Sequence, residues 1–477
     1  MRQAGSDIRM LKRTKIVCTL GPSSDDEATL RAMIQGGMNV ARLNLSHGTR
    51  AEHLVRMSSV RRLSGELGEH VAVMVDTRGP DVRIGDLETE TVELLNGAEL
   101  TLTGERIAGN AQRLSVSFPD LPSLLASGDI VYLDDGMIEL EVIRAGVSEA
   151  VCRVVAGGTL RGHKGVNCPG KSIPLPILTD EDIADLEVMS ERGADYLAAS
   201  FVRTREDVRE IRATLGGDGI PIIAKIESAS GVENLEAIID ESDGVMVARG
   251  DLGVEIPPEE VPGVQKRIIE TARRTSKPVI TATEMLESMV RSPRPTRAEI
   301  ADIANAVLGG TSAVMLSEET AVGAYPVEAV RIMARVCRRA EQDLAFDPAP
   351  PLEGERKTVR AGIAHAGCLL ARDIGAPAII CVTDSGATAA ILSHYRAPQP
   401  VLACTPHASV ARKLSMYWGV LPIVVAEQDS VEELLDRAVE LGKKKGLIAE
   451  GDRIVFTGNL SGRGGETNLL ASVTVGA

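Results

Sequence analysis

The chain alternates between short β-rich segments and longer amphipathic helical segments, and this alternation recurs eight times before residue 342. The β-rich segments, runs of Val, Ile, Leu and Ala, are residues 15–20, 39–46, 71–77, 196–202, 221–227, 244–250, 278–285 and 313–319. The predicted helices are residues 25–36, 50–68, 180–193, 204–215, 231–240, 259–276, 296–308 and 326–341. Eight strand–helix units in sequence predict a closed parallel (βα)8 TIM barrel of the α/β class.

The series is interrupted once, after the third predicted strand. The interrupting segment is rich in Val, Leu, Thr and Gly, contains turn signals such as the Leu-Asp-Asp-Gly of residues 133–136, and has no long helical period. It is therefore predicted to be a small all-β domain inserted into the barrel. Gly79-Pro80 and Pro169-Gly170 are its predicted hinges.

A proline-rich linker at residues 347–355 ends the barrel series. Helical and β-rich segments alternate again beyond it, which predicts a C-terminal α/β domain with helices on both faces of a sheet. The predicted division is a barrel domain at 1–78 and 172–346, an inserted β-barrel domain at 79–171, and a C-terminal domain at 347–477.

Composition narrows the class of protein. Hydrophobic residues make up 44% and charged residues 25% of the chain, which is typical of soluble globular proteins. A formal net charge of −15 and only 2% aromatic residues argue against nucleic-acid or anionic-membrane binding. No apolar run approaches a membrane span and no signal-peptide pattern opens the chain, so a cytoplasmic location is expected. The seven cysteines are scattered and indicate neither a disulfide framework nor a zinc site.

Polar residues follow nearly every predicted barrel strand at its carboxyl end, where the active sites of such barrels form. Residues two apart in a strand share one face, which groups Arg42 with Asn44 and Ser46, and Lys225 with Glu227. The other strand ends contribute Asp76, Thr77, Gly250, Asp251, Thr283, Ser317 and Glu319.

Glu227 and Asp251 come from neighbouring strands and form a pair of hard oxygen ligands suited to Mg2+. Lys225 and Arg42 would bracket an anion beside that metal, which is the equipment for phosphoryl transfer. A lone Lys-x-Glu more often forms an ion pair inside a barrel, but Asp251 and Arg42 at the same mouth favour the functional interpretation. The chain lacks a P-loop and the protein-kinase motifs, which argues against those mechanisms.

Ten segments in order make the chain resemble the pyruvate kinase family across nearly its whole length. They are KIVCTLGPSS, GMNVARLNLSHG, DTRGPDVR, KGVNCPG, ASFVR, AKIES, MVARGDLGVEIP, TATEMLESM, PTRAEIADIANAV and MLSEETAVGAYP. The resemblance implies transfer of the phosphoryl group of phosphoenolpyruvate to ADP, giving pyruvate and ATP in the last step of glycolysis. It also implies a homotetramer and a lid role for the insert, which would close over the barrel mouth and exclude water.

The resemblance also implies roles for single residues. Glu227 and Asp251 would bind Mg2+ (or Mn2+), and Lys225 would stabilise the transferring phosphoryl group. Arg42 would contact the same phosphate, and Thr283 with the backbone of Gly250 and Asp251 would hold the substrate carboxylate. The family's K+ ligands match Asn44, Ser46, Asp76 and Thr77, and its positions near ADP match His47, Arg83 and Lys164.

Four residues depart from the family pattern. DTRGPD stands where DTKGPE is common, so that Arg78 replaces a lysine and Asp81 a glutamate. An acidic residue at the position of Asp81 accompanies K+ dependence in the family, so K+ activation is expected. Glu284 and Glu318 add negative charge near the barrel mouth.

The C-terminal domain has a strand-to-helix turn that contains Thr383, Ser385, Gly386 and Thr388, and a Gly-rich stretch at 457–465. Such a turn can hold a phosphate, or it can be an ordinary capped loop. Similarity to the effector loops of pyruvate kinases favours a phosphorylated allosteric ligand, either a sugar phosphate or AMP.

Two other functions stay open from the sequence. A metal-dependent barrel lyase or aldolase acting on pyruvate could use Glu227 and Asp251, but it would have no need of the lid or of Lys164. A degenerate regulatory paralogue would be expected to lose charges at the barrel mouth, whereas Arg42 and Lys225 are both present.

Overall fold

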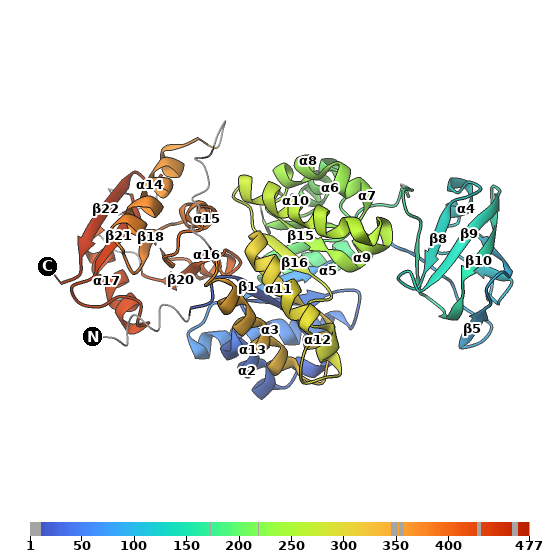
Figure 1. Ribbon diagram of the computed structural model, residues 1–477, viewed down its shortest axis with the longest axis horizontal. Helices are drawn as coiled ribbons and strands as arrows, with labels where there is room; N and C mark the ends of the chain where they lie inside the picture. The colour runs from blue at the N-terminus through green and yellow to red at the C-terminus, as the bar shows by residue number, and fades with distance from the viewer. Residues whose placement is uncertain are drawn as a thin grey trace.

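The computed structural model describes residues 11–171, 173–217, 219–344, 352, 357–426, 431–459 and 466–476. Figure 1 shows three bodies in a row, with the barrel in the middle, the inserted β domain at one end and the C-terminal domain at the other. The predicted linker at 347–355 lies outside the described residues except for Leu352. Within the described ranges, no helix is long and apolar enough to cross a membrane.

Eight parallel strands close the central barrel, as the alternation in the sequence predicts. They are β1 (Lys15–Thr19), β2 (Val40–Asn44), β3 (Ala72–Asp76), β13 (Tyr196–Ala199), β14 (Ile222–Ile226), β15 (Gly244–Ala248), β16 (Val279–Ala282) and β17 (Ala313–Leu316). Their order around the barrel is β1-β17-β16-β15-β14-β13-β3-β2. The chain therefore returns to β1 through β17, with Lys15 in register with Ala313.

Helices surround the barrel and cover its outer face. They are α2 (Glu27–Gly36), α3 (Arg50–Leu67), α5 (Asp180–Glu191), α6 (Arg205–Thr214), α7 (Ala229–Glu233), α8 (Leu235–Glu241), α10 (Val261–Arg274), α11 (Arg297–Gly309) and α13 (Pro326–Ala340). The helix predicted at 231–240 is two helices that meet at Asn234. Two further short helices, α9 (Arg249–Glu255) and α12 (Glu318–Ala321), begin where β15 and β17 end.

Alternate residues of each strand face opposite sides, and this alternation builds two cores. One set packs between the strands and the outer helices and includes Ile16 and Cys18. The other set fills the barrel interior and includes Val17, Ile223 and Met246. Since the interior is packed with side chains, a ligand can reach the barrel only at its mouth.

The insert is an all-β domain with one four-residue helix, α4 (Leu121–Leu124). Its main sheet has the order β4-β12-β8-β9-β10-β6-β7, from β4 (Val82–Arg83), β12 (Gly165–Asn167), β8 (Ile130–Leu133), β9 (Ile138–Ala145), β10 (Glu149–Ala156), β6 (Glu99–Thr103) and β7 (Arg113–Ser115). The pair β5 (Thr91–Leu94) and β11 (Gly158–Arg161) lies apart. A bridge between Ile84 and Val116 joins the two edges, so the sheet curls around its own apolar core.

The C-terminal domain is a five-stranded sheet of order β20-β19-β18-β21-β22. Its strands are β18 (Ile379–Val382), β19 (Val401–Thr405), β20 (Val420–Val424), β21 (Arg453–Gly458) and the antiparallel β22 (Leu469–Thr474). Residues of α14 (Val359–Asp373), α15 (Ala387–His394) and α16 (Ala408–Leu414) share one core, and those of α17 (Val431–Lys444) share the other. The expected helices on both faces are therefore present. Met416 packs into the interior core of the barrel and so joins this domain to the barrel's closed end.

Candidate active site

The uppermost layer of the barrel interior is polar on four neighbouring strands. Arg42, Asp76 and Lys225 lie two residues beyond Val40, Met74 and Ile223, which belong to the interior apolar core. Ser200 likewise lies two residues beyond Ala198, which belongs to the same core. All four polar residues are buried, and Asp76 is fully so. The period of the strands therefore brings a set of charged groups to the point where the interior core ends.

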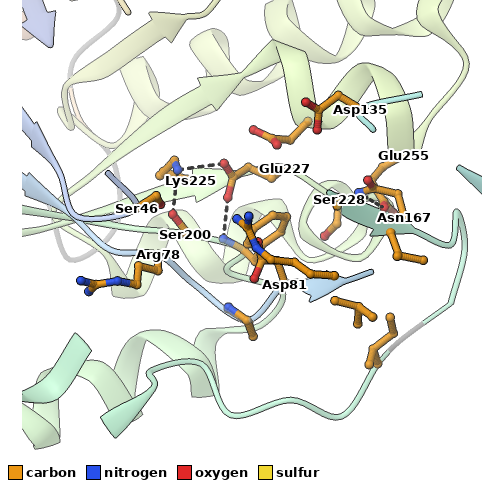
Figure 2. A pocket seen from close by; sticks show the side chains of 18 of the residues that line it. Ser46, Arg78, Asp81, Asp135, Asn167, Ser200, Lys225, Glu227, Ser228 and Glu255 are labelled. Atoms are coloured by element: carbon orange, nitrogen blue, oxygen red, sulfur yellow. Dashed lines mark hydrogen bonds and ion pairs between the residues drawn. The ribbon is translucent and has the colours of Figure 1, made fainter. Parts of the chain in front are cut away.

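These groups form one network around Asp76 (Figure 2 shows its Lys225, Ser200 and Glu227 members). Asp76 Oδ2 accepts a hydrogen bond from Arg42 Nε at 2.5 Å, and Asp76 Oδ1 lies 3.2 Å from Lys225 Nζ. Lys225 Nζ also lies 3.0 Å from Glu227 Oε1 and donates to Ser200 Oγ at 2.7 Å. Each buried charge has an opposite charge beside it, as burial of ions requires.

The network fixes the ionisation of its members. Burial lowers the pKa of Lys225, but the carboxylates of Asp76 and Glu227 outweigh burial and hold that pKa above its ordinary value. Burial raises the pKa of Asp76, but Arg42 and Lys225 outweigh it and hold the pKa below its usual range. For Glu227 burial prevails over the attraction of Lys225, so the pKa of this carboxyl is raised. Lys225 is therefore expected to carry a positive charge at neutral pH.

Glu227, whose Oε1 lies 3.0 Å from Lys225 Nζ, and Asp251 are two of the carboxylates that line the cleft. Glu227 Oε2 accepts the backbone N–H of Phe201 at 2.6 Å, which orients this carboxylate. Asp251 lies in α9, directly after β15, the neighbour of β14. In the described part of the chain, no three His, Cys, Asp or Glu side chains gather as a metal site. Two carboxylates alone fit Mg2+, which retains water and takes other ligands from substrate phosphates.

Thr283 and Gly250, to which the resemblance gives the role of holding the substrate carboxylate, lie together. Gly250 N donates to Thr283 Oγ1 at 2.8 Å, and Thr283 Oγ1 donates to Ala282 O at 2.7 Å. Thr283 has a φ of +63°, a left-handed conformation that is uncommon for a residue other than glycine. Arg249 holds this turn through Thr283 O, and its guanidinium pairs with Asp302 of α11 at 2.7 Å.

The four residues that match K+ ligands supply oxygen donors at the ends of β2 and β3. Asn44, Ser46 and Thr77 line the cleft, whereas Asp76 lies beneath it. Asn44 Oδ1 accepts the backbone N–H of Ser46 at 3.2 Å. The all-oxygen donor set is chemically suited to a hard monovalent cation. In this structure the carboxylate of Asp76 already pairs with Arg42 and Lys225. A bound monovalent cation would therefore share that carboxylate with both side chains.

The cleft between the barrel mouth and the insert has a volume of about 390 Å³. His47 lines it from the barrel side, and Arg83 and Lys164 line it from the insert. Arg83 pairs with Asp81 at 2.6 Å and Lys164 with Asp134 at 2.7 Å. Both insert cations are at least partly solvent-exposed, so an anionic ligand could exchange with these carboxylates.

Several polar strand-end residues lie elsewhere. Glu319 is buried, but its carboxylate accepts the backbone N–H groups of Leu286 and Ser317 at 3.0 and 2.6 Å and so holds two loops together. Glu284 and Glu318 are solvent-exposed. Arg78 lines the cleft but points away from Lys225 and Glu227 (Figure 2) and pairs with Asp185 of α5 at 2.8 Å.

The predicted effector turn lies between β18 and α15, far from the cleft. Thr383 Oγ1 accepts the backbone N–H of Gly386 at 3.0 Å, and Thr388 shares a hydrogen bond of 2.5 Å with Thr467. Ser385 is exposed. Residues 460–465 of the second Gly-rich stretch lie outside the described residues.

Reasoning from the sequence missed Ser200, Phe201 and Arg203, although the ASFVR segment that contains them resembles the family. Ser200 contacts Lys225, and Phe201 holds Glu227 through a backbone N–H. A serine two residues past the interior position Ala198 is a signal that could have identified Ser200. A backbone contact made by Phe201 leaves no signal in side-chain chemistry. The insert and α9 also contribute Asp135, Asn167 and Glu255 to the cleft.

Comparison with known proteins gives one consistent result. The family model described as the barrel domain of pyruvate kinase matches residues 11–330, and the model of its alpha/beta domain matches residues 361–471. The chain is 43% identical over 467 residues to the pyruvate kinase of Clostridium acetobutylicum, covering 96% of this chain and 99% of the relative. It is 42% identical over 469 residues to that of Geobacillus stearothermophilus, covering 97% and 80%. The crystal structure of a pyruvate kinase from Cryptosporidium parvum superposes with a TM-score of 0.92 at 37% identity, covering 98% of this chain and 97% of that one.

Proposed function

The chain belongs to the pyruvate kinase family, and from this membership we infer which of its residues carry the family's reaction. The reaction transfers the phosphoryl group of phosphoenolpyruvate to ADP and gives pyruvate and ATP in the last step of glycolysis, so the chain is a phosphotransferase. A divalent metal and a monovalent cation belong to the family's requirements. The observation that carries our residue assignment is the buried network of Arg42, Asp76, Lys225 and Glu227 at the barrel mouth.

The divalent cation is Mg2+ (or Mn2+), held by Glu227 and Asp251. When bound, it neutralises charge on the anionic substrate. Within the buried network, Arg42 and Lys225 lie beside the carboxylates of Asp76, Glu227 and Asp251, so a divalent cation would offset the excess negative charge that an anionic substrate meets at this point. The monovalent cation is K+, held by Asn44, Ser46, Asp76 and Thr77.

Lys225 and Arg42 orient the phosphoryl group of phosphoenolpyruvate, and Thr283 with the backbone of Gly250 and Asp251 holds the substrate carboxylate. A β-phosphate oxygen of ADP forms the new P–O bond as the bond to the enol oxygen breaks in line. Lys225 stabilises the negative charge that remains on the enolate oxygen, because its ammonium is already held in place and needs no reorganisation.

The enolate takes up a proton at its terminal carbon to become pyruvate. The proposed donor of this proton is a water near Thr283. The observation in favour of such a water is that Ser317 Oγ is buried and has no hydrogen-bond partner within the described residues. A hydroxyl in that condition can hold an ordered water.

The nucleotide lies between the barrel and the insert. His47, Arg83 and Lys164 line the cleft there and would bind the ADP phosphates. The insert, at residues 79–171, would act as a lid that excludes water and so favours transfer to ADP over hydrolysis. The barrel domain would comprise 1–78 and 172–346.

The C-terminal domain, 347–477, would be regulatory. Thr383, Ser385, Gly386 and Thr388 form a turn at the start of α15 where backbone N–H groups and hydroxyls could hold the phosphate of a sugar phosphate or AMP. A homotetramer and a cytoplasmic location complete the proposal.

The first test is the initial rate of pyruvate formation from phosphoenolpyruvate and ADP with Mg2+, in K+ buffer and in K+-free buffer. ADP-dependent pyruvate that rises sharply with K+ supports the reaction and the cation site together. A rate indifferent to K+ would count against the roles of Asp81 and of the four K+ ligands. Pyruvate formation without ADP would favour a lyase.

A further inference from the structure

The segment Ser200–Arg203, here called the rim loop, runs from β13 to α6 along the barrel mouth. It contacts both the reaction site and the two linkers that join the insert to the barrel. The first linker is residues 77–81, and the second is residues 168–179, of which residue 172 lies outside the described residues. Among the described residues of the mouth, the rim loop is thus placed to tie the position of the insert to the position of the reacting groups.

The rim loop is fixed on the side of the reaction site. Ser200 Oγ accepts from Lys225 Nζ at 2.7 Å, and Phe201 N donates to Glu227 Oε2 at 2.6 Å. Phe201 has a φ of +55°, a left-handed conformation that is unfavourable for an L-residue with a bulky side chain. Such a conformation persists where surrounding contacts hold it.

The rim loop also holds the first linker. Ser200 N donates to Thr77 Oγ1 at 3.1 Å, and Ser200 Oγ donates to Thr77 O at 2.8 Å. Gly79 passes so close that a Cβ there would lie 2.6 Å from the Cβ of Ser200. The first linker therefore has little freedom relative to the rim loop.

The side chain of Arg203 holds the second linker through two backbone carbonyls of that linker. Its two terminal guanidinium nitrogens donate to Ile173 O at 2.6 Å and to Leu175 O at 3.0 Å. Ile173 and Leu175 pack against the core of the insert, so their backbone moves with that domain. Asp207, the carboxylate nearest to Arg203, accepts the backbone N–H groups of Arg203 and Thr204 at 2.7 and 2.9 Å. The guanidinium is thus directed to the linker, with its Nε 3.7 Å from Asp207.

We propose that Arg203 is a positioning residue of the reaction: by fixing the second linker, it sets the orientation in which Arg83 and Lys164 of the insert reach the nucleotide. This inference rests on the proposed function of those two cations. It assigns Arg203 to nucleotide binding through the insert, whereas phosphoenolpyruvate depends on barrel groups that Arg203 does not contact.

The geometry requires arginine. Two carbonyls two residues apart are held at once by the planar fork of one guanidinium, whereas the ammonium of lysine is a single point charge. Arg203→Lys keeps the charge and most of the apolar stem but loses the planar fork. It therefore separates the contribution of the fork from the contribution of the charge. Arg203→Met removes both.

The experiment measures KM for ADP and for phosphoenolpyruvate in Arg203→Lys, Arg203→Met and the control Arg209→Met. Arg209 lies on the exposed side of α6, the helix that follows the rim loop, and pairs with Glu241 at 2.9 Å. We expect both Arg203 variants to raise KM for ADP roughly 10-fold, the loss expected when two charge-assisted hydrogen bonds no longer orient a binding domain. KM for phosphoenolpyruvate and thermal stability should stay near wild type.

Amide hydrogen exchange gives a second readout that needs no activity. Exchange at the backbone amides of Ile173, Leu175, Ile177 and Leu178 should accelerate in both Arg203 variants and not in Arg209→Met, while exchange in β14 stays unchanged. An unchanged KM for ADP would overturn the proposal, and so would a Lys variant that matches wild type. A parallel rise of both KM values with a lower Tm would show a merely structural role. Wild-type protein that makes no pyruvate would instead count against the proposed function.

Discussion

At the residue scale, the barrel mouth holds several buried charged side chains, although apolar side chains would suffice to fill the barrel interior. Asp76 has no exposed surface, yet its carboxylate receives Arg42 and Lys225. Removing water from such groups is costly, and only their mutual pairing makes their burial tolerable. Under the proposed function the benefit is chemical, because charges held in a fixed array stabilise a transition state without reorganising.

Substitution of Lys225 tests this array. Lys225→Met removes the cation that the proposed function places beside the breaking P–O bond, so kcat should fall on the order of 10² to 10³, as for other preorganised electrostatic groups. The measurement is the steady-state rate of pyruvate formation at saturating substrates. The control is Lys266→Met, whose side chain is 74% exposed on α10. A Lys225→Met enzyme with near-normal kcat would refute the assignment.

At the element scale, side chains at helix starts decide where the outer helices begin. At α11, Thr296 accepts the backbone N–H of Glu299 at 3.2 Å, and the Glu299 carboxylate accepts the N–H of Thr296 at 2.6 Å. Glu299 also receives the backbone and hydroxyl of Ser288 at 2.7 and 2.6 Å. This capping box therefore joins the start of α11 to the preceding loop.

Loss of this cap should affect stability and not catalysis. Thr296→Ala should lower the free energy of unfolding by about 1 kcal/mol, the typical cost of removing an N-cap side chain. The change in Tm relative to wild type measures it, and kcat should be unchanged because Thr296 and Glu299 are not among the residues that line the cleft. Thr296→Ser keeps the hydroxyl and should recover most of the loss. Equal destabilisation by Ser and Ala would rule out the cap as the cause.

In the linkers of the insert, backbone conformation and close packing restrict which residue can stand at a position. Gly79 has a φ of +74°, and a Cβ there would lie 2.6 Å from Ser200 and 2.9 Å from the ring of Phe201. Gly79→Ala should push the rim loop away from Lys225 and Glu227. We expect kcat/KM to fall about 10- to 100-fold, since a shift of about 1 Å in reacting groups has effects of this order.

Gly170→Ala is the matched control for Gly79→Ala. Gly170 has a φ of +75° but nothing within 4 Å of its Cβ position. Its alanine variant carries the same backbone strain, about 1–2 kcal/mol, without the collision. Activity near wild type in Gly170→Ala and reduced activity in Gly79→Ala would separate crowding from strain. Equal losses in both would contradict the role given to crowding.

At the scale of the whole molecule, the C-terminal domain closes the end of the barrel opposite the cleft. Asp195, just before β13, accepts Arg61 of the barrel at 2.6 Å and Arg412 of the C-terminal domain at 2.9 Å. Tyr196 donates to Lys413 O at 2.6 Å. Apolar packing and buried polar contacts therefore join the two domains. A change that weakens these contacts should lower the free energy of unfolding of both domains.

His394 makes this junction sensitive to acid. Its Nδ1 lies 2.5 Å from Arg273 O of the barrel, and burial lowers the pKa of His394 from 6.5 to about 4, with the nearby Arg273 and Arg396 charges acting in the same direction. The folded protein holds His394 neutral, whereas the unfolded chain takes up a proton below pH 6.5. The stability that neutral His394 contributes is therefore present at pH 7 and is lost as pH falls from 6.5 towards 4.

His394→Asn should reduce that dependence on pH. Between pH 7.5 and 5.5, we expect the variant to lose about 1 kcal/mol less stability than wild type, because it has no imidazole to protonate on unfolding. Denaturant midpoints at the two pH values measure the difference, and His163→Asn, at an exposed position of the insert, is the control. An identical loss in wild type and His394→Asn would contradict this assignment.

Periodicity in the sequence predicted the fold because each barrel strand is buried on both faces and each helix on one. The eight strands, the all-β insert and the helices on both faces of the C-terminal sheet are confirmed. The predicted boundaries differ from the observed ones where a helix begins directly after a strand. The predicted strand 313–319 ends at Leu316, because the carboxylate of Glu319 accepts two backbone N–H groups and a helix turns at Glu318.

The sequence by itself determined the barrel, the insertion point and the strand-end residues of the mouth, because strand period two assigns each residue to one face. The contacts among those residues were decided by the tertiary structure. Asp76 becomes a partner of Arg42 and Lys225 only when β2, β3, β13 and β14 lie side by side, and Glu227 is oriented by a backbone N–H from residue 201. Arg203 reaches the second linker across 30 and 28 residues of chain. Such contacts depend on the closure of the barrel, which local patterns along the chain do not specify.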